Sequence, residues 1–290
     1  DLTRALPEFV AEAALQVKRL KPDGGTSFNC VNTWPVELMA RRTEDQVTYM
    51  ELWAPNDTYR DLYDQIHLAR VAGPHKQVVI AAYLSAFHKE TPRSPEAIHG
   101  LKLAAAAIFA SGGFYLLMGE GNGVLAKDYF PDFGRVAGED LSAVQRYWDF
   151  VTAYGELLHD RELRDVSKTW NGVYITETQY QAPVECSPMA KPGTVWTILK
   201  EKPGRRVLHL INLSNQASAL WNELKAAPAP VDGMTVTFMQ YAPVRAAWYA
   251  SPDDGGAPQR LEVLPDPEGK PFVHLRLPRL QTWGMVWLEE

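Results

Sequence analysis

The stretch Val47-Thr48-Tyr49-Met50-Glu51-Leu52-Trp53-Ala54-Pro55 decides how the first half of the chain is interpreted. Strand alternation puts Glu51 on one face with Tyr49 and Trp53, and Met50 on the other. A carboxylate among β-branched and aromatic residues is costly to bury, so it needs a chemical reason. A loop follows Trp53, so we expect Glu51 at the carboxyl end of its strand, where α/β sheets keep their sites. The alternative is a glutamate on a solvated face, and position alone does not decide.

The composition is that of an ordinary globular protein. Its 290 residues, 46% apolar and 22% charged, suffice for two domains or one large one. The net charge is −6 and no basic stripe is present, so nucleic acid is not expected as a partner. The nine Trp and twelve Tyr suit stacking on sugars, and suit a large core equally well.

Cysteine and histidine patterns offer no metal or cofactor site. Cys30 and Cys186 lie far apart and fit neither a metal spacing nor a disulfide framework, so two separate buried thiols are expected. The histidines are scattered without an H-E-x-x-H motif, so we expect no metal and no cofactor. The apolar stretch 101–118 is interrupted by Ser111-Gly112-Gly113, which predicts a core helix end and a buried strand rather than a membrane span. The chain as given carries no signal-peptide pattern.

Helical and strand patterns alternate through residues 1–162. Apolar spacing of three and four predicts helices at 2–20, 58–71 and 140–159, and a short one at 35–42. Ser94-Pro95 predicts the start of another helix that runs to about residue 106. Strands are predicted at 27–32, from residue 47, and at 77–85 and 108–111. These patterns make about four strand–helix units.

Short strands with Gly/Pro turns replace this alternation in residues 163–290. Such a pattern predicts an antiparallel β-sandwich domain, with the boundary between residues 162 and 163. Lys202-Pro203-Gly204 predicts a hairpin turn. The predicted strands are 194–199, 206–213, 234–241, 246–250, 261–264, 272–277 and 282–288.

Four strand–helix units are half of the eight in a closed (β/α)₈ TIM barrel. Four units could also form an open sheet, but no strand is followed by a glycine-rich phosphate loop or G-x-G-x-x-G. Half a barrel would leave its apolar inner face bare at two open edges, so something must complete it.

Several motifs follow one another in a familiar order. Tyr49-Met50-Glu51-Leu52-Trp53 with Asn56-Asp57-Thr58-Tyr59, then Ala81-Ala82-Tyr83, Gly119-Glu120-Gly121 and Asp128-Tyr129-Phe130-Pro131, resemble the catalytic region of glycoside hydrolase family 66. This family comprises dextranases and cycloisomaltooligosaccharide glucanotransferases. Further matches, Tyr147-Trp148-Asp149-Phe150 and Ser251-Pro252-Asp253, carry the resemblance through the family's C-terminal sandwich.

The resemblance implies retaining attack on α-1,6-linked glucan by two carboxylates on a (β/α)₈ barrel. Glu51 matches the general acid/base, which protonates the leaving glycosidic oxygen and then deprotonates the incoming water or sugar hydroxyl. Such an acid needs apolar surroundings, which Tyr49 and Trp53 would supply. The resemblance also implies an extracellular enzyme whose partner is α-1,6-glucan or isomaltooligosaccharide.

The partner carboxylate is the difficulty. The family's nucleophile is an aspartate on an earlier barrel strand, and nothing here matches that motif; Asp23 and Asp45 lie in turn-like contexts. We therefore expect the nucleophile on an upstream half-barrel segment, in the same protein or in a second chain, so that residues 1–162 form the second half of the barrel. The less favoured alternative makes Glu120 the nucleophile and the chain self-sufficient.

The remaining candidates are substrate-binding residues. Asn32 and Tyr83 lie at strand ends, and Trp53 would either stack on a glucose ring or pack in the core. Asn56 and Asp57 are turn formers by type, so a structural role competes with sugar binding. Glu120 stands where the family has aspartate. The loop after Tyr83 is short where cyclising members carry an insert, which favours a plain dextranase. A non-catalytic glucan-binding or scaffold module stays open as the second class of function.

Overall fold

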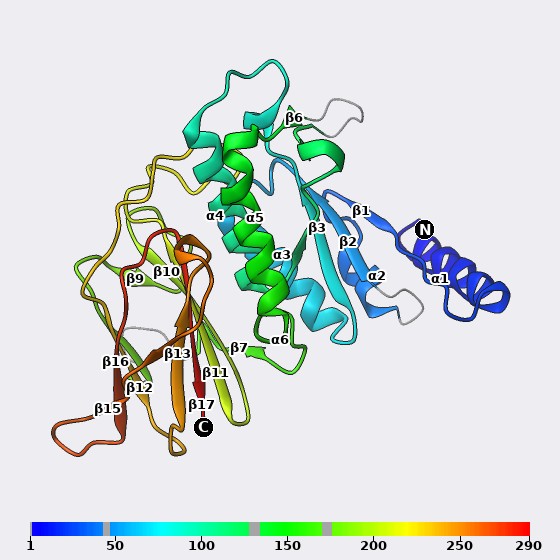
Figure 1. Ribbon diagram of the computed structural model, residues 1–290. Coiled ribbons are helices and arrows are strands. Elements are labelled where there is room, and N and C mark those ends of the chain that lie inside the picture. The colour runs from blue at the N-terminus through cyan, green and yellow to red at the C-terminus, as the bar shows by residue number, and fades with distance from the viewer. Residues whose placement is uncertain (1, 43–46, 128–133, 170–175) are drawn as a thin grey trace. The chain divides into compact units, whose positions relative to one another are not determined.

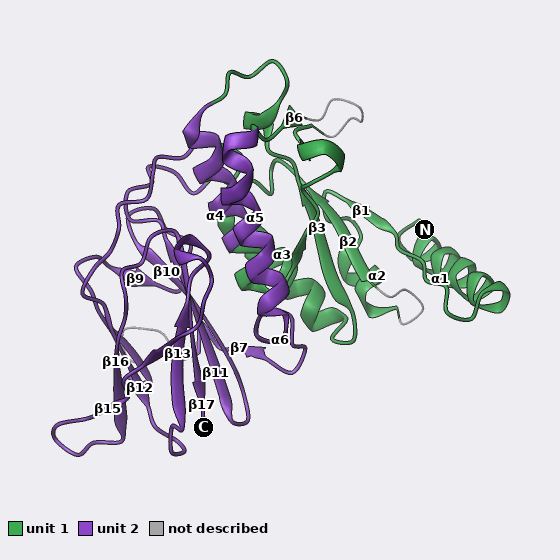
Figure 2. Cartoon of the chain, viewed as in Figure 1, with its two compact units in different colours: residues 1–93, 107–137, 220–223 green, residues 94–106, 138–219, 224–290 purple. Residues whose placement is uncertain are grey.

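The computed structural model describes residues 2–42, 47–127, 134–169 and 176–290 (Figure 1). The chain divides into two compact units that interleave along the sequence (Figure 2). Unit 1 comprises residues 1–93, 107–137 and 220–223, and unit 2 comprises residues 94–106, 138–219 and 224–290. The single boundary expected between residues 162 and 163 stays a prediction.

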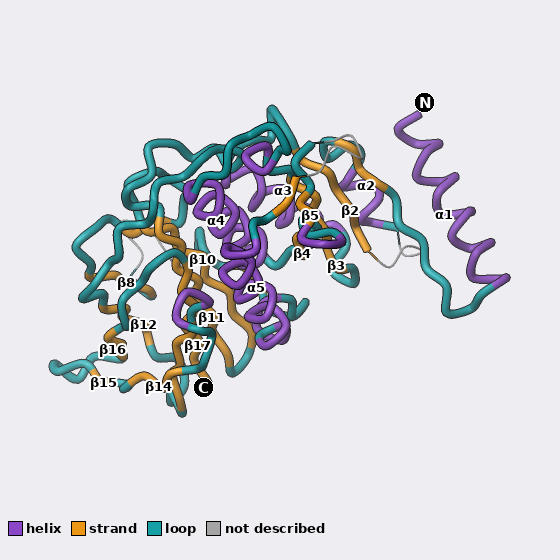
Figure 3. Tube along the Cα trace, turned by 45° about the horizontal axis from the view of Figure 1, so that its top comes forward, coloured by secondary structure: helices purple, strands orange, loops and turns teal. Residues whose placement is uncertain are grey.

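Unit 1 is built on a four-stranded parallel sheet in the order β1-β2-β3-β4. The mixed α/β character predicted for the first half of the chain is confirmed. Helix α1 lies on the β1 side of this sheet in both views (Figures 1 and 3). The strands are β1 (Asn29–Val31), β2 (Val47–Leu52), β3 (Gln77–Ala82) and β4 (Phe114–Tyr115), and the helices are α1 (Leu2–Leu20), α2 (Val36–Arg41) and α3 (Tyr59–Ala72).

Strand β2 has the alternation that its sequence predicts. Thr48, Met50 and Leu52 are buried, whereas Tyr49 and Glu51 are partly exposed. Helix α3 then begins with a capping box, in which the Thr58 hydroxyl accepts from the Asp61 amide and the Asp61 carboxylate accepts from the Thr58 amide at 2.9 Å. This cap fixes where the loop after β2 ends.

The prediction for residues 101–118 is wrong in part. Helix α4 (Pro95–Ser111) continues through the predicted strand at 108–111, and the fourth strand lies beyond Gly112-Gly113. Residues 104–107 are four alanines, the best helix formers, and Ile108 is fully buried on the helix. An apolar run that is buried all round has no period that separates helix from strand, so Gly112, at φ 92°, ends the helix later than predicted. None of the helices in the described ranges is both long and apolar enough to cross a membrane.

Unit 2 consists mainly of two β-sheets, as the short strands and turns predict. One sheet has the order β14-β13-β17-β11-β10-β7, with β9 paired to β10, and the other has the order β15-β16-β12-β8. The strands are β7 (Arg164–Asp165), β8 (Thr178–Gln181), β9 (Cys186–Ser187), β10 (Val195–Lys202), β11 (Arg205–Asn212), β12 (Thr235–Met239), β13 (Ala246–Ala250), β14 (Gln259–Leu261), β15 (Leu264–Pro265), β16 (Phe272–Arg276) and β17 (Trp283–Glu289).

The hairpin prediction is confirmed, and two others need correction. Gly204, at φ 77°, joins β10 to β11 directly after a proline, the conformation that glycine takes in a type II turn. The strand predicted at 261–264 is instead the end of β14 and the start of β15, which belong to different sheets. The helix predicted at 140–159 is split at Tyr154 into α5 (Gly138–Ala153) and α6 (Gly155–Leu158).

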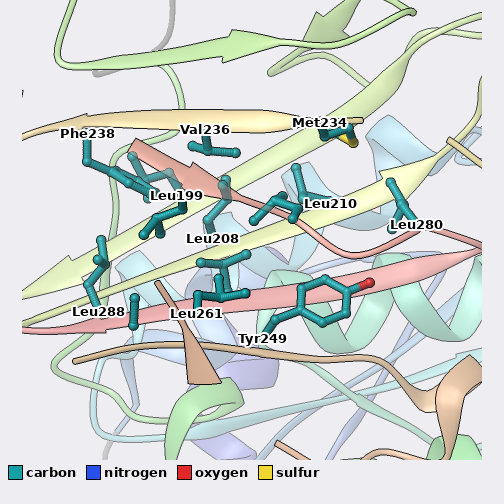
Figure 4. Packing of buried hydrophobic residues seen from close by; sticks show 14 of the residues in the cluster. Leu199, Leu208, Leu210, Met234, Val236, Phe238, Tyr249, Leu261, Leu280 and Leu288 are labelled. Carbon is teal, nitrogen blue, oxygen red and sulfur yellow. The ribbon is translucent and has the colours of Figure 1, made fainter. Parts of the chain in front are cut away.

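Both sheets of unit 2 bury side chains in one core (Figure 4). Leu199 and Leu208 come from the larger sheet, and Val236 and Phe238 from the smaller one, and all four are at most 1% exposed. Since the two apolar faces cover each other, the core stabilises both sheets together.

Close approach of backbone segments in unit 1 makes Gly73 a sensitive position. A Cβ atom there would lie 2.3 Å from the Ala40 carbonyl oxygen, and that oxygen belongs to the backbone of α2. We expect Gly73→Ala to lower the free energy of unfolding by about 1–3 kcal/mol, the usual cost of overpacking. Denaturant unfolding measures this loss.

Gly138→Ala is the matched control, because nothing lies within 4 Å of its added Cβ. Its free energy of unfolding should stay within about 0.5 kcal/mol of the parent. A Gly73→Ala protein as stable as the control would contradict the close approach of α2 to residue 73.

Candidate functional site

The carboxyl ends of three parallel strands meet at one edge of the unit 1 sheet. Asn32, Trp53 and Tyr83 each directly follow the last residue of β1, β2 and β3. Glu51 lies one residue before the end of β2, in register with Val31 on one side and Ala81 on the other. Residues distant in sequence are therefore neighbours at the edge where parallel sheets hold their sites.

Glu51 is held by an aromatic neighbour. The Tyr83 hydroxyl donates a hydrogen bond of 2.6 Å to Glu51 Oε1, and the Tyr83 side chain itself is buried. The Trp53 and Tyr83 rings lie 6.3 Å apart between centroids, at an angle of 29°. Burial, together with the charge of Glu51, raises the pKa of the Tyr49 phenol. Glu51 is thus an oriented, partly buried carboxylate among aromatic rings, which argues against a merely solvated face.

Two asparagines join the ends of β1 and β2. Asn56 Nδ2 donates to Asn32 Oδ1 at 2.9 Å, and Asn32 Nδ2 donates to the Ala54 carbonyl oxygen at 3.2 Å. Thr33, directly after Asn32 at φ 45°, has a φ of 71°, in the left-handed region that β-branched residues rarely enter. Such strain persists only where the surroundings impose it, and it is commonly found at functional sites.

The other two candidates differ in their surroundings. Asp57 is half-buried, and its backbone carbonyl accepts a hydrogen bond of 2.8 Å from the Trp221 amide. Glu120 is exposed in the short 3₁₀ helix η2 (Glu120–Asn122), and within the described residues no hydrogen bond or ion pair joins it to Glu51. Asp45 and the motif Asp128-Tyr129-Phe130-Pro131 lie outside the described residues.

Two side chains that the sequence did not indicate lie beside this group. Trp221, 1% exposed, donates from Nε1 to the Asn56 carbonyl oxygen at 2.8 Å. Asn222 Oδ1 accepts from the Ser85 amide at 2.9 Å. Both come from the connection between β11 and β12, and no local pattern in that connection signals a contact so distant in sequence.

Metal ligands do not gather in the part of the chain that the structure describes. No group of three or more His, Cys, Asp or Glu side chains there has the geometry to hold an ion. Cys30 is buried on β1, and Cys186 is half-buried on β9.

These observations define an α/β unit with a carboxylate at the carboxyl end of its parallel sheet, followed by antiparallel sheets. Comparison with known proteins identifies the class more closely. The chain belongs to glycosyl hydrolase family 66, whose family profile matches residues 1–287.

Relatives of the chain include two kinds of curated protein. A cycloisomaltooligosaccharide glucanotransferase of Niallia circulans is 30% identical over 196 residues, which are 66% of this chain and 20% of the relative. A dextranase of Streptococcus salivarius is 23% identical over 312 aligned residues, covering 91% of this chain and 37% of that relative. The chain thus spans well under half the length of these relatives.

The fold is shared with a solved structure. The crystal structure of a cycloisomaltooligosaccharide glucanotransferase of Paenibacillus sp., complexed with cycloisomaltoheptaose, superposes with a TM-score of 0.85. The match covers 99% of this chain and 59% of that one, at 18% sequence identity. At this identity the likeness establishes the fold alone.

The asparagine pair predicts a measurable coupling. We expect Asn32→Ala and Asn56→Ala each to destabilise the protein, and the double variant to cost about 0.5–1.5 kcal/mol less than the sum, because the side-chain hydrogen bond is lost only once. Free energies of unfolding for the four proteins give this coupling. Strictly additive losses would show that the two side chains do not bond to each other.

Proposed function

We propose that the chain carries the general acid/base of a retaining hydrolase that cleaves α-1,6-glucosidic linkages inside dextran-like glucan. The observation that carries this proposal is the carboxylate of Glu51, oriented by Tyr83 at the carboxyl end of β2. Membership of the family and the similarity to a dextranase support the substrate class.

In the proposed reaction, Glu51 gives its proton to the glycosidic oxygen as a nucleophilic carboxylate attacks the anomeric carbon from the opposite face. A covalent glycosyl-enzyme forms and the leaving sugar departs with the proton. Glu51, now a carboxylate, then takes a proton from water as the water oxygen bonds the anomeric carbon. The bond from that carbon to the nucleophilic carboxylate breaks, which frees the sugar and restores both carboxyl groups. Because Tyr83 binds Oε1, we assign both proton transfers to the other oxygen, Oε2.

Sugar contacts in this proposal come from the same edge of the sheet. The half-buried Trp53 offers a ring for stacking, and the amides of Asn32 and Asn56 offer donors and acceptors for hydroxyls. Asp57 and Glu120 are proposed as further sugar contacts. Tyr83 borders the subsite through its ring as well as holding Glu51.

The nucleophile is proposed to come from an upstream half-barrel segment, in the same protein or a second chain, that completes a (β/α)₈ barrel with unit 1. Strand β1 lies at one edge of the four-stranded sheet in the described residues, where a barrel would continue with the next strand. Val31 at its end is 49% exposed, although apolar. The rival nucleophile, Glu120, would have to lie about 5–5.5 Å from Glu51, the separation that a retaining mechanism uses.

The proposal also covers the type of reaction and the location of the complete enzyme. Only a short segment separates β3 from α4, which favours hydrolysis over a cyclising transfer. Family resemblance implies an extracellular enzyme. The second candidate function is a non-catalytic module that binds α-glucan or serves as a scaffold. It is favoured by the small share of the relatives' length that the chain covers, 20% and 37%.

The role of Glu51 is tested by Glu51→Gln in the full-length protein. Loss of the proton donor should lower kcat on dextran by about 10²–10⁴-fold. With an isomaltosyl fluoride, whose leaving group needs no protonation, the rate of the first step should fall far less. Glu185→Gln, at a side chain 60% exposed, is the control and should keep full activity. Dextran hydrolysis retained by Glu51→Gln would remove Glu51 from the mechanism.

The origin of the nucleophile is tested by assaying the 290-residue chain alone on dextran and measuring its mass in solution. We expect no hydrolysis by a monomer, and activity once an upstream half-barrel segment is added. Turnover by the isolated monomer would show that the chain supplies both carboxylates. Glucan binding without turnover under every combination would favour the non-catalytic module.

A further inference from the structure

Residues 220–223 form a strap that belongs to unit 1 although the chain before and after it belongs to unit 2. The strap lies in the connection between β11 and β12 and consists of Leu220, Trp221, Asn222 and Glu223. Its contacts include the loop after β2, the strand that carries Glu51, and the segment after β3, where Tyr83 lies.

The first set of contacts fixes the loop after β2. Leu220 makes an antiparallel bridge to Thr58, and the Trp221 amide donates to the Asp57 carbonyl oxygen at 2.8 Å. Trp221 Nε1 donates at 2.8 Å to the carbonyl oxygen of Asn56. Three consecutive residues of the loop are thus bound by two residues of the strap.

Trp221 acts on the site through Asn56. The side chain of Asn56 reaches Asn32 at the end of β1, so the orientation of its peptide sets where both amides lie. The indole is 1% exposed, and a buried hydrogen bond of this kind is not readily exchanged for one to water. The chain of contacts from Trp221 to Asn56 to Asn32 therefore spans the ends of two strands.

The second set of contacts reaches the loop after β3. Asn222 Oδ1 accepts from both the amide and the hydroxyl of Ser85, at 2.9 and 3.0 Å. Ser85 is two residues beyond Tyr83, whose hydroxyl bonds Glu51. Burial raises the pKa of Tyr59 at the start of α3, and the nearby charge of Glu223 raises it further. The end of the strap therefore lies beside that helix as well.

We propose that the strap is a positioning element of the candidate site: Trp221 positions the Asn56–Asn32 pair that binds sugar, and Asn222 positions the backbone that follows Tyr83. This inference rests on the proposed function for its readout. Neither residue touches the reacting atoms, so both are positioning residues. Because Trp221 supports the sugar contacts and Asn222 supports the segment after Tyr83, we expect the two residues to affect different kinetic constants.

The test uses the full-length protein and dextran. Trp221→Phe keeps a buried ring and removes the indole donor, and we expect KM to rise about three- to tenfold, the size of one lost hydrogen bond, with kcat within about twofold. Asn222→Ala should instead lower kcat about threefold at unchanged KM, and Asn222→Asp, which keeps the acceptor, should restore it. Trp248→Phe, on β13 of unit 2, is the control and should change neither constant.

A cycle separates positioning from general destabilisation. Because Trp221 works through Asn56, the double variant Trp221→Phe/Asn56→Ala should have the same KM as Asn56→Ala alone. Fully additive increases in KM, or unchanged constants in both strap variants, would overturn the proposal. If Trp221→Phe does not fold, the comparison of kcat between Asn222→Ala and Asn222→Asp tests the proposal instead. Glu51→Gln assayed in parallel keeps the two questions apart, since its retained activity would contradict the proposed function whatever the strap variants do.

Discussion

The parallel register of β1, β2 and β3 is the constraint on which the site depends. Val31, Glu51 and Ala81 lie side by side, so Asn32, Trp53 and Tyr83 follow at the same sheet edge. A slip of β2 by one residue would turn Glu51 into the layer occupied by Met50 and Leu52, both fully buried. The free energy of burying that layer therefore also fixes the direction of the catalytic candidate.

Much of this arrangement could be predicted from sequence, because it follows from local patterns. The alternation of β2, the capping residues Thr58 and Asp61, and the strand-end positions of Asn32 and Tyr83 all depend on neighbours close in the chain. The strand prediction at residues 108–111 failed because this local information was missing. An alanine-rich segment that is buried on every side gives no period, so only the packed structure shows where α4 ends.

Contacts between distant segments could not be predicted. Nothing near Trp221 specifies that its indole will meet the carbonyl oxygen of Asn56, 165 residues away. The Tyr83–Glu51 hydrogen bond spans 32 residues and follows from the register of two strands, which a single sequence does not state. The roles of Asn56 and Asp57 could not be decided from sequence, because the same residue types form turns and bind sugars.

In the proposed function the candidate site divides two tasks, proton transfer and sugar binding, between segments of different rigidity. Glu51 and Tyr83 stand on or directly after paired strands, whose ladder hydrogen bonds limit their movement. Asn32 directly follows β1 at positive φ, and Asn56 lies in the loop after β2; the two keep their geometry through bonds to each other, to Ala54 and to Trp221. Proton transfer needs fixed distances, whereas glucose hydroxyls can be met by adaptable amides. In that proposal the loop after β2 requires outside support, and the buried indole of Trp221 supplies it through its bond to Asn56.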